Sequence, residues 1–276
     1  MGSASIGQVH KGKLHDGTFV AVKIQYPDIE ELFRSDIFTM RLFCKFVAPE
    51  QLIIFDEIER QFMSEFDYRQ EAKQLDQVRN NMAPFSRDVV VPRPFLNLCS
   101  KNVLVMEFLD GKQLIDGIRE SASVYATKQG KTLEQLERET KAKWEKEGLP
   151  IAYSGPSAAQ IASYRWAVKI KDFFFNIPLC IFNWTIVPCL FLTPIPFYDS
   201  FIPLNGAMIM ETLLQVHGHQ LFINGFFNGD PHAGNFLLLA DGRIGLIDYG
   251  QVKQLTREER LYLVSCKVIR EKREKE

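Results

Sequence analysis

The sequence predicts an α+β protein, with short β-strands toward both ends of the chain and amphipathic helices between them. Residues 7–25 alternate apolar and polar side chains around one Asp-Gly turn, and residues 236–247 place two short apolar strands around another. Both patterns are typical of β-hairpins. Between these hairpins, apolar residues recur every three or four positions, which is the period of helices that cover a core.

The composition is that of an ordinary globular protein. Its 276 residues include 33 basic and 34 acidic side chains, so the net charge is close to zero and gives no general attraction to nucleic acid. Nucleic acid is therefore not an expected partner. The five cysteines lack Cys-x-x-Cys spacing, which argues against a disulfide framework or zinc site and favours free thiols in a reducing compartment.

The N-terminal hairpin carries a lysine at a position from which it could reach phosphate. Residues 2–5 are expected to form a loop of small side chains, in which Ala4 and Ser5 bring backbone amides close to phosphate oxygens. Lys23 follows Val20-Ala21-Val22 on the strand beneath that loop. The other interpretation is a strand lysine that simply faces water.

Two helical stretches follow this hairpin. Residues 30–47 show the amphipathic period, and a second helix is expected from about residue 55 to residue 75. The second stretch carries three carboxylates, on Glu65, Asp67 and Glu71. Such charges commonly lie on a solvated face, but with Lys23 upstream one of them is the expected ion-pair partner of the lysine.

The segment from Asn228 to Gly250 concentrates the side chains that phosphoryl transfer needs. Asp230 and Asn235 lie five residues apart, and Asp248 follows the second strand of the C-terminal hairpin. In protein kinases, Asp-x-x-x-x-Asn supplies the residue that orients the nucleophile and one Mg²⁺ ligand, and a later Asp-Phe-Gly supplies another. Taken alone, the pattern is also that of common turns, because Gly permits positive φ and Asp bonds its own backbone.

In their order along the chain, these motifs resemble the UbiB family of atypical protein-kinase-like proteins. The segments that carry the resemblance are residues 4–10, 20–27, 65–72, 229–235 and 247–250, within matching regions at 2–120 and 206–260. The resemblance implies a bilobal protein-kinase-like fold that binds ATP and Mg²⁺. It also implies ATPase or phosphotransfer activity that supports coenzyme Q or other isoprenoid lipid metabolism.

The resemblance assigns roles to single residues. Lys23 corresponds to the lysine that contacts phosphate, and Glu71 to its helix partner. Asp230 corresponds to the catalytic aspartate, and Asn235 and Asp248 correspond to the metal ligands. In this prediction Lys23 and Glu71 bind the nucleotide, Asp230 is catalytic, and Asn235 and Asp248 bind the metal.

The sequence also departs from the family pattern. Gly2-Ser3-Ala4 stands where relatives usually have three alanines, and Ala233 stands where proline is common. In relatives, the acidic pair that corresponds to Glu65 and Asp67 contacts a Lys-x-Gly-Gln motif on an N-terminal extension. We expect that extension, the first strand of the sheet and several C-terminal helices to lie outside this chain, and the chain alone to be unstable.

The strand at residues 103–107 leads to the position of the hinge in a kinase. Met106, Glu107 and Leu109 are expected to line the adenine site, although a core methionine is the other interpretation of Met106. The expected domains are a kinase-like N-lobe with hinge, an inserted helical and apolar segment, and the start of the C-lobe. Their boundaries are 1–111, 112–205 and 206–276.

Within the insertion, residues 173–198 contain no charged side chain. This length is sufficient to cross a bilayer, which takes about 20 apolar residues. A regular spanning helix tolerates polar and proline interruptions poorly, and this stretch contains Asn176, Pro178, Asn183, Pro188, Pro194 and Pro196. A transmembrane span, a membrane-surface element and packing against the large lobe all remain open.

The resemblance also implies a location and partners. It favours a mitochondrial protein associated with the inner membrane, with a plastid as the alternative, and membrane lipid or coenzyme Q biosynthetic proteins as partners. The start of this chain has no recognisable targeting segment. A second functional hypothesis is an ATP-binding, membrane-associated scaffold without phosphotransfer, because Asn228-Gly229 replaces the usual His-Arg before the catalytic aspartate.

Overall fold

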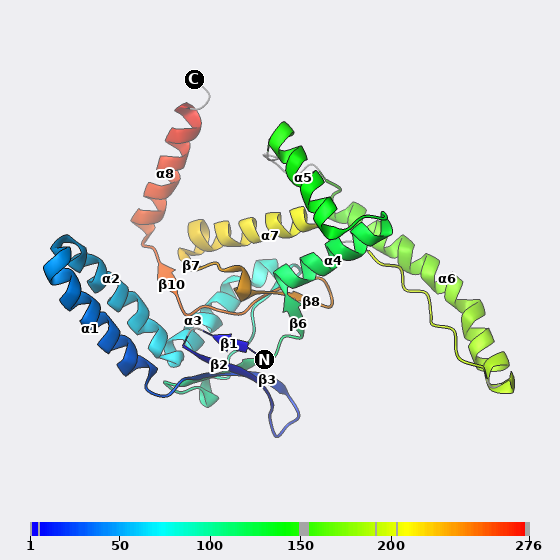
Figure 1. The fold of residues 1–276 in the computed structure, drawn as a ribbon, viewed down its shortest axis with the longest axis horizontal. Helices are drawn as coiled ribbons and strands as arrows, with labels where there is room; N and C mark the ends of the chain where they lie inside the picture. The colour runs from blue at the N-terminus through cyan, green and yellow to red at the C-terminus, as the bar shows by residue number, and fades with distance from the viewer. Residues whose placement is uncertain (1, 5, 149–154, 191, 203, 274–276) are drawn as a thin grey trace. The chain divides into compact units, whose positions relative to one another are not determined.

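The computed structural model describes residues 2–4, 6–148, 155–190, 192–202 and 204–273. It divides the chain into two compact units, the first made of residues 1–117 with 212–276 and the second of residues 118–211. Strands and helices alternate through the first unit (Figure 1), which confirms the predicted α+β class. The predicted boundaries of the kinase-like lobes stay a prediction.

A four-stranded antiparallel sheet begins the first unit. Its strands are, in spatial order, β1 (Gly2–Ala4), β2 (Gly7–Lys13), β3 (Phe19–Gln25) and β5 (Val103–Glu107). Lys23 pairs with Leu104, and Ala21 pairs with Met106. Directly opposed residues share a face of a sheet, so the side chains of Lys23 and Met106 lie on the same face.

The structure corrects the predicted loop at residues 2–5. Residues 2–4 form strand β1, which folds back on β2 and pairs Ala4 with Gly7. Ser5 lies outside the described residues. Close packing explains why glycine occupies position 7, since an added Cβ there would lie 2.3 Å from the Ile24 carbonyl oxygen.

Three helices follow β3, and the expected single helix over residues 55–75 is wrong. Helices α1 (Ile29–Val47) and α2 (Leu52–Met63) lie side by side (Figure 1), and the rings of Phe33 and Phe62 are 5.4 Å apart. A short 3₁₀ turn and Asp67 then separate α2 from α3 (Tyr68–Asn81). Asp67 has extended backbone angles and accepts a hydrogen bond from the Arg69 amide, so it caps a new helix instead of continuing the old one.

Helix α3 supplies much of the core of the first unit. It lies against β5, and its inward face is almost completely shielded from solvent. The residues of that face are Tyr68, Ala72, Leu75 and Val78, of which none is more than 1 % exposed. Apolar burial on this face therefore fixes α3 relative to the sheet.

The C-terminal part of the first unit contains the predicted hairpin. Strands β8 (Phe236–Leu239) and β9 (Ile244–Leu246) are antiparallel, and Gly242 adopts a φ of 89° in the turn between them, which confirms the Asp-Gly hairpin. They form a sheet with β4 (Val89–Val90) and β6 (Gly111–Gln113) in the order β4-β9-β8-β6. The remaining elements are the strand pair β7 (Phe226–Asn228) and β10 (Val252–Gln254), a π-helix (His219–Asn224) and helices α7 (Gly206–Gly218) and α8 (Arg257–Arg273).

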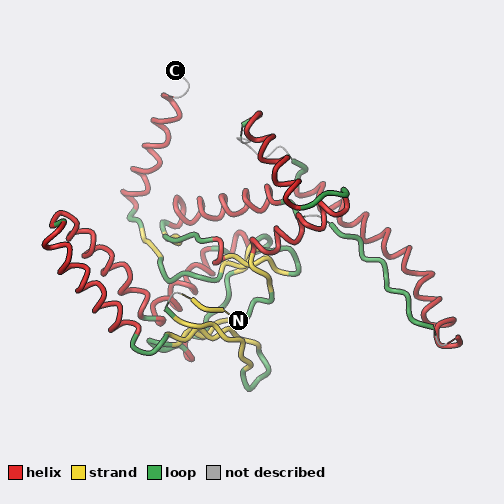
Figure 2. Tube along the Cα trace, in the orientation of Figure 1, coloured by secondary structure: helices red, strands yellow, loops and turns green. Residues whose placement is uncertain are grey.

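The second unit is helical. Helix α4 (Leu114–Lys128) leads into it, and α5 (Leu133–Glu147) begins with the predicted capping box, in which Thr132 and Gln135 exchange hydrogen bonds of 2.9 and 3.3 Å. Helix α6 (Ala158–Leu190) runs without a break through Pro178 and Pro188. An extended segment then returns along α6 (Figure 2). Of the helices that the structure describes, only α6 has the length and apolar composition of a membrane span.

The burial of α3 gives a test of the fold. Leu75→Ala removes a side chain that is 1 % exposed, and we expect it to lower the free energy of unfolding by about 2–5 kcal/mol. Leu42→Ala on α1, where the side chain is 51 % exposed, serves as the matched control and should cost less than about 1 kcal/mol. Denaturant unfolding of both variants measures the difference. Equal losses would contradict the packing of α3 described above.

Candidate functional site

The centre of the site is a buried ion pair between the N-terminal sheet and helix α3. The Nζ atom of Lys23 on β3 lies 2.9 Å from one carboxylate oxygen of Glu71 on α3 and 3.1 Å from the other. Both side chains are buried. The Asp248 carboxylate, which follows β9, lies 3.6 Å from the same Nζ atom. Lys23 therefore brings together three segments that are far apart in the sequence.

The electrostatics of this cluster keep the lysine charged. Burial alone would lower the pKa of Lys23, but the carboxylates of Glu71 and Asp248 outweigh that effect and hold the pKa above its ordinary value. Lys23 also lies over the Tyr68 ring, with 5.0 Å between Nζ and the ring centroid. A positively charged ammonium group thus lies on an inner strand of the sheet, beside a half-exposed carboxylate.

Asn228, a residue that sequence reasoning did not select as functional, connects the loop of Asp230 with the segment of Asp248. Its amide nitrogen donates to the Asp248 carbonyl at 2.9 Å, and its amide oxygen accepts from the Asp230 amide at 2.9 Å. The side chain of Asn235 donates to the Asp230 carbonyl at 3.3 Å. These bonds link Asp230, Asn235 and Asp248 in one hydrogen-bonded network, and their catalytic and metal-binding roles stay predictions.

Asp248 also orders the backbone that follows it. One of its carboxylate oxygens accepts a hydrogen bond from the Gly250 amide at 3.0 Å, which closes a short turn. Tyr249, between these two residues, turns inward and is 3 % exposed. Its hydroxyl accepts a 3.0 Å hydrogen bond from Gln220 in the π-helix, and Gln220 is itself 2 % exposed. Burial raises the pKa of Tyr249 to about 12, so the hydroxyl stays protonated.

The two acidic residues Glu65 and Asp67 have different environments. Glu65 accepts a hydrogen bond from Gln251, just beyond the Asp-Tyr-Gly segment, and its pKa is raised by burial and by the charges of Asp248 and Asp230. Asp67 instead pairs with Arg69, with 2.8 Å between Oδ2 and Nη2, which lowers its pKa. Glu65 thus belongs to the cluster around Asp248.

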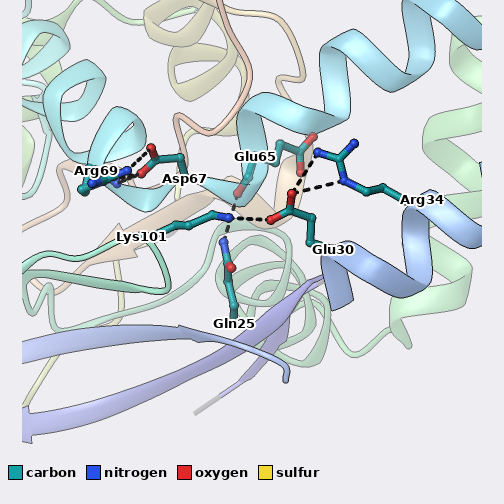
Figure 3. A network of polar contacts seen from close by, with 7 residues as sticks. All are labelled: Gln25, Glu30, Arg34, Glu65, Asp67, Arg69 and Lys101. Atoms are coloured by element: carbon teal, nitrogen blue, oxygen red, sulfur yellow. Dashed lines mark hydrogen bonds and ion pairs between the residues drawn. The ribbon is translucent and has the colours of Figure 1, made fainter. Parts of the chain in front are cut away.

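Figure 3 shows the contacts around the backbone of Glu65. The side-chain amide of Gln25, at the end of β3, donates to the backbone carbonyl of Glu65 at 3.4 Å. Nearby, Glu30 on α1 accepts from Lys101 at 2.7 Å and from Arg34 at 3.0 Å. These bonds tie the start of α1 and the 3₁₀ turn to the sheet that carries Lys23.

Tyr68, whose ring lies beneath Lys23, also has a buried hydroxyl. The residue is 0 % exposed, and within the described part of the chain its hydroxyl has no hydrogen-bond partner. Burial raises the pKa of Tyr68 to about 12, so this oxygen carries a proton that it can donate. The hydroxyl lies toward the N-terminal hairpin, because a Cβ added to Gly7 would be 3.1 Å from it.

The predicted hinge residues follow β5. Met106 is buried on the same sheet face as Lys23, two pairs along the register. The amide of Glu107 donates to the Arg93 carbonyl at 2.8 Å, and the carboxylate of Glu107 accepts from the Arg93 amide at 3.2 Å. Leu109 extends toward Gly245 on β9, where an added Cβ would lie 3.1 Å from its Cδ1 atom. Glu107 is thus engaged with Arg93, and Leu109 lies against the hairpin.

The donor set fits Mg²⁺ better than a transition metal. In the described residues no group of three or more His, Cys, Asp or Glu side chains is arranged as a complete metal cage. Mg²⁺ usually takes one or two carboxylates together with water and phosphate oxygens. The half-exposed Asp248 carboxylate and the amide oxygen of Asn235 match that requirement.

Comparison with known proteins identifies the family of the chain. The ABC1 atypical kinase-like domain matches residues 1–138 and 201–275, which is more than half of the chain. The chain belongs to the ABC1, or UbiB, family of atypical kinase-like proteins. The family assignment confirms the predicted resemblance and the kinase-like fold.

Curated relatives support the UbiB assignment. Protein ACTIVITY OF BC1 COMPLEX KINASE 1, chloroplastic, of Arabidopsis thaliana is 25 % identical over 96 % of this chain and 29 % of its own length. AarF domain-containing protein kinase 1 is 33 % identical in Gallus gallus, over 50 % of this chain and 26 % of the relative. This UbiB-family chain therefore spans less than a third of the length of either relative.

One solved structure also matches the chain. Rv3197 of Mycobacterium tuberculosis, determined with erythromycin, matches with a TM-score of 0.47 and 24 % identity. The match covers 91 % of this chain and 44 % of that protein.

The charge pairing of Lys23 and Glu71 predicts a non-additive mutational response. Lys23→Met or Glu71→Leu alone leaves a buried charge without its partner, and each should lower the free energy of unfolding by about 3–5 kcal/mol. The double variant should recover much of that loss. Lys101→Met, at the exposed pair with Glu30, is the control and should change stability by less than about 1 kcal/mol. Additive losses in a denaturant-unfolding cycle would argue against a coupled pair.

The two buried tyrosines should respond to loss of their hydroxyls with opposite signs. Tyr68→Phe removes an unsatisfied buried hydroxyl, so the free energy of unfolding should rise by about 1 kcal/mol. Tyr249→Phe leaves the Gln220 amide without its partner and should lower that free energy by about 1–3 kcal/mol. Thermal unfolding without nucleotide distinguishes the two. Shifts of the same sign would show that these hydroxyls do not have the environments described.

Proposed function

We propose that this chain carries the nucleotide site of an atypical kinase-like enzyme that binds ATP with Mg²⁺ and has ATPase or phosphotransfer activity. The observation that carries the proposal is the position of the Lys23 ammonium group, 2.9 Å from Glu71 and 3.6 Å from Asp248. In kinases, a strand lysine held by a helix glutamate contacts the phosphates, and the Asp of the Asp-Phe-Gly segment holds the metal.

The residues of the chain divide the work of phosphoryl transfer between them. Glu71 fixes the Lys23 side chain so that its charge meets the α and β phosphates without a search among rotamers. The Tyr68 ring, 5.0 Å from Nζ, supports the charge from below. Held in this way, Lys23 would offset charge on the phosphates in a site that is set before the substrate arrives.

Asn235 and Asp248 would hold Mg²⁺, which when bound neutralises phosphate charge. Asp230 would orient the nucleophile, water or an acceptor hydroxyl, and receive its proton. Asn228 acts on both through its two amide bonds, because it fixes the Asp230 backbone relative to Asp248. Glu65, raised in pKa beside these carboxylates, adds negative charge only when it is ionised.

The wider role follows the family. We infer that the activity supports coenzyme Q or other isoprenoid lipid metabolism in an organelle, with the mitochondrial inner membrane as the expected location and a plastid as the alternative. The relatives named chloroplastic support an organellar setting. Coenzyme Q biosynthetic proteins and membrane lipid are the corresponding candidate partners.

A second candidate function is a nucleotide-binding scaffold without phosphotransfer. Protein kinases place His-Arg before the catalytic aspartate, whereas here Asn228-Gly229 occupies those positions. The Asn228 side chain is buried, and both ends of its amide group are hydrogen-bonded. Such a protein would bind Mg-ATP and change conformation, but would not turn it over.

Matched aspartate variants separate these functions. Asp248→Asn should abolish the thermal stabilisation that Mg-ATP gives and lower turnover about a hundredfold or more, because a metal ligand is lost. Asp230→Asn should lower turnover similarly but keep the stabilisation. Asp241→Asn, in the exposed hairpin turn, is the control and should leave both unchanged.

Turnover and thermal shift are measured on the same purified protein. A wild-type protein that nucleotide does not stabilise, or an Asp248→Asn variant with full turnover, would refute the enzyme. Nucleotide stabilisation without turnover in the wild type would favour the scaffold.

A further inference from the structure

In the uncharged stretch of the second unit, the described residues 173–190 and 192–198 form a hairpin with two different arms. The first arm is the C-terminal half of α6, and the second is the extended segment that follows Leu192 (Figure 2). The second arm ends at Ser200, which contacts Asp172 near the middle of α6. The chain thus leaves and returns at the same level of the helix.

Three polar side chains of α6 hold the returning arm by its backbone. The Asn183 side chain both accepts from the Ile195 amide at 2.9 Å and donates to the Ile195 carbonyl at 2.8 Å. Asn176 does the same with Tyr198, at 2.6 and 2.9 Å. Asp172 accepts from both the amide and the hydroxyl of Ser200. The side-chain amides of the two asparagines that interrupt the apolar stretch are therefore hydrogen-bonded within the hairpin.

The residues of α6 that are shielded from solvent lie on the face that holds the returning arm. Positions 172, 176, 179, 183 and 187 are buried or half-buried, and they recur every three or four residues. Most other side chains of the arm are apolar and exposed, including Phe173 at 65 % and Trp184 at 81 %. Polar groups face inward and apolar groups face outward, which is the reverse of the arrangement in water.

The backbone of the returning arm also has a reduced demand for partners. Pro194 and Pro196 carry no N–H group, and the Leu192 amide donates to the Val187 carbonyl at 3.1 Å. In hydrocarbon, every backbone polar group must find its partner within the protein. Alternating proline with residues that the asparagines hold is one way to meet that demand in an extended segment.

The dimensions and charges agree with a bilayer. The arm from residue 173 to residue 190 rises roughly 27 Å at about 1.5 Å per residue, close to the ~30 Å hydrocarbon core. Arg165, Lys169 and Lys171 precede the uncharged stretch, and Asp199 follows it. The basic side chains on the α6 side of the base suit anionic lipid headgroups.

From this geometry we infer that residues 173–198 insert into the acyl region of a lipid bilayer as a re-entrant hairpin, with both ends on the same side. A partner protein would cover one face, whereas the exposed apolar surface extends around all of the helix except the stripe that holds the returning arm. The ABC1 match does not cover residues 139–200, so the hairpin belongs to the insertion. The inference does not depend on nucleotide binding.

Native cysteines give a direct test. Cys180 and Cys189 are exposed on α6, and single-cysteine versions of the full protein can be mixed with sealed vesicles of phosphatidylcholine and phosphatidylglycerol. We expect both to lose reactivity toward a membrane-impermeant maleimide when vesicles are added. Ser163→Cys and Asp199→Cys, beyond the two ends of the hairpin, should both stay reactive.

Charge substitutions test what the hairpin contacts. Trp184→Asp should weaken vesicle binding at least tenfold, because it places a charge in hydrocarbon. Phe46→Asp on α1 replaces a side chain with a similar exposure of 79 % and should leave binding unchanged. The unfolding midpoints of both variants verify that they are folded.

Several outcomes would overturn the proposal. If Cys180 and Cys189 react fully with the maleimide in the presence of vesicles, or if Trp184→Asp binds vesicles as well as the wild type, the hairpin does not contact lipid. If vesicles protect only one of Ser163→Cys and Asp199→Cys from the maleimide, the segment crosses the bilayer completely instead. Self-association without vesicle binding would show that a second copy covers the apolar surface.

Discussion

The buried charge of Lys23 is the constraint on which the first unit depends. An ammonium group removed from water is very unfavourable unless carboxylates compensate for it, and here Glu71 and Asp248 provide that compensation from α3 and from the end of the C-terminal hairpin. Strand β3, helix α3 and the segment after β9 must therefore meet at one point. The apolar face of α3 packs on β5 and makes that meeting geometrically possible. Core packing and the site are in this sense one structure.

Side-chain amides perform the same physical task in both units. Asn228 joins two loops in the first unit, and Asn176 and Asn183 join an extended segment to α6 in the second. An amide group has both a donor and an acceptor, so one side chain can satisfy two backbone groups where regular secondary structure ends. In the first unit this arrangement holds carboxylates in position. In the second it leaves only apolar atoms on the outside.

Local patterns predicted local structure well, and long-range contacts less well. The hairpin at Asp241-Gly242 and the capping box at Thr132 were predictable because neighbouring residues determine them. The break at Asp67 was missed because the apolar period continues across it, although an aspartate followed by a helix is a cap signal. The role of Asn228 and the bond from Gln220 to Tyr249 depend on segments that meet only in the folded chain. No periodicity or spacing could have indicated them.

The position of the insertion has a consequence for biosynthesis. A ribosome adds Lys23 and Glu71 before residues 118–211, and it reaches Asp248 only after them. At about 5–20 residues per second, the chain from Glu71 to Asp248 takes roughly 9–35 seconds to synthesise, so Lys23 and Glu71 are made well before their third partner. During that interval the apolar hairpin of residues 173–198 is synthesised, so the nascent chain exposes this apolar surface before the charged cluster is complete.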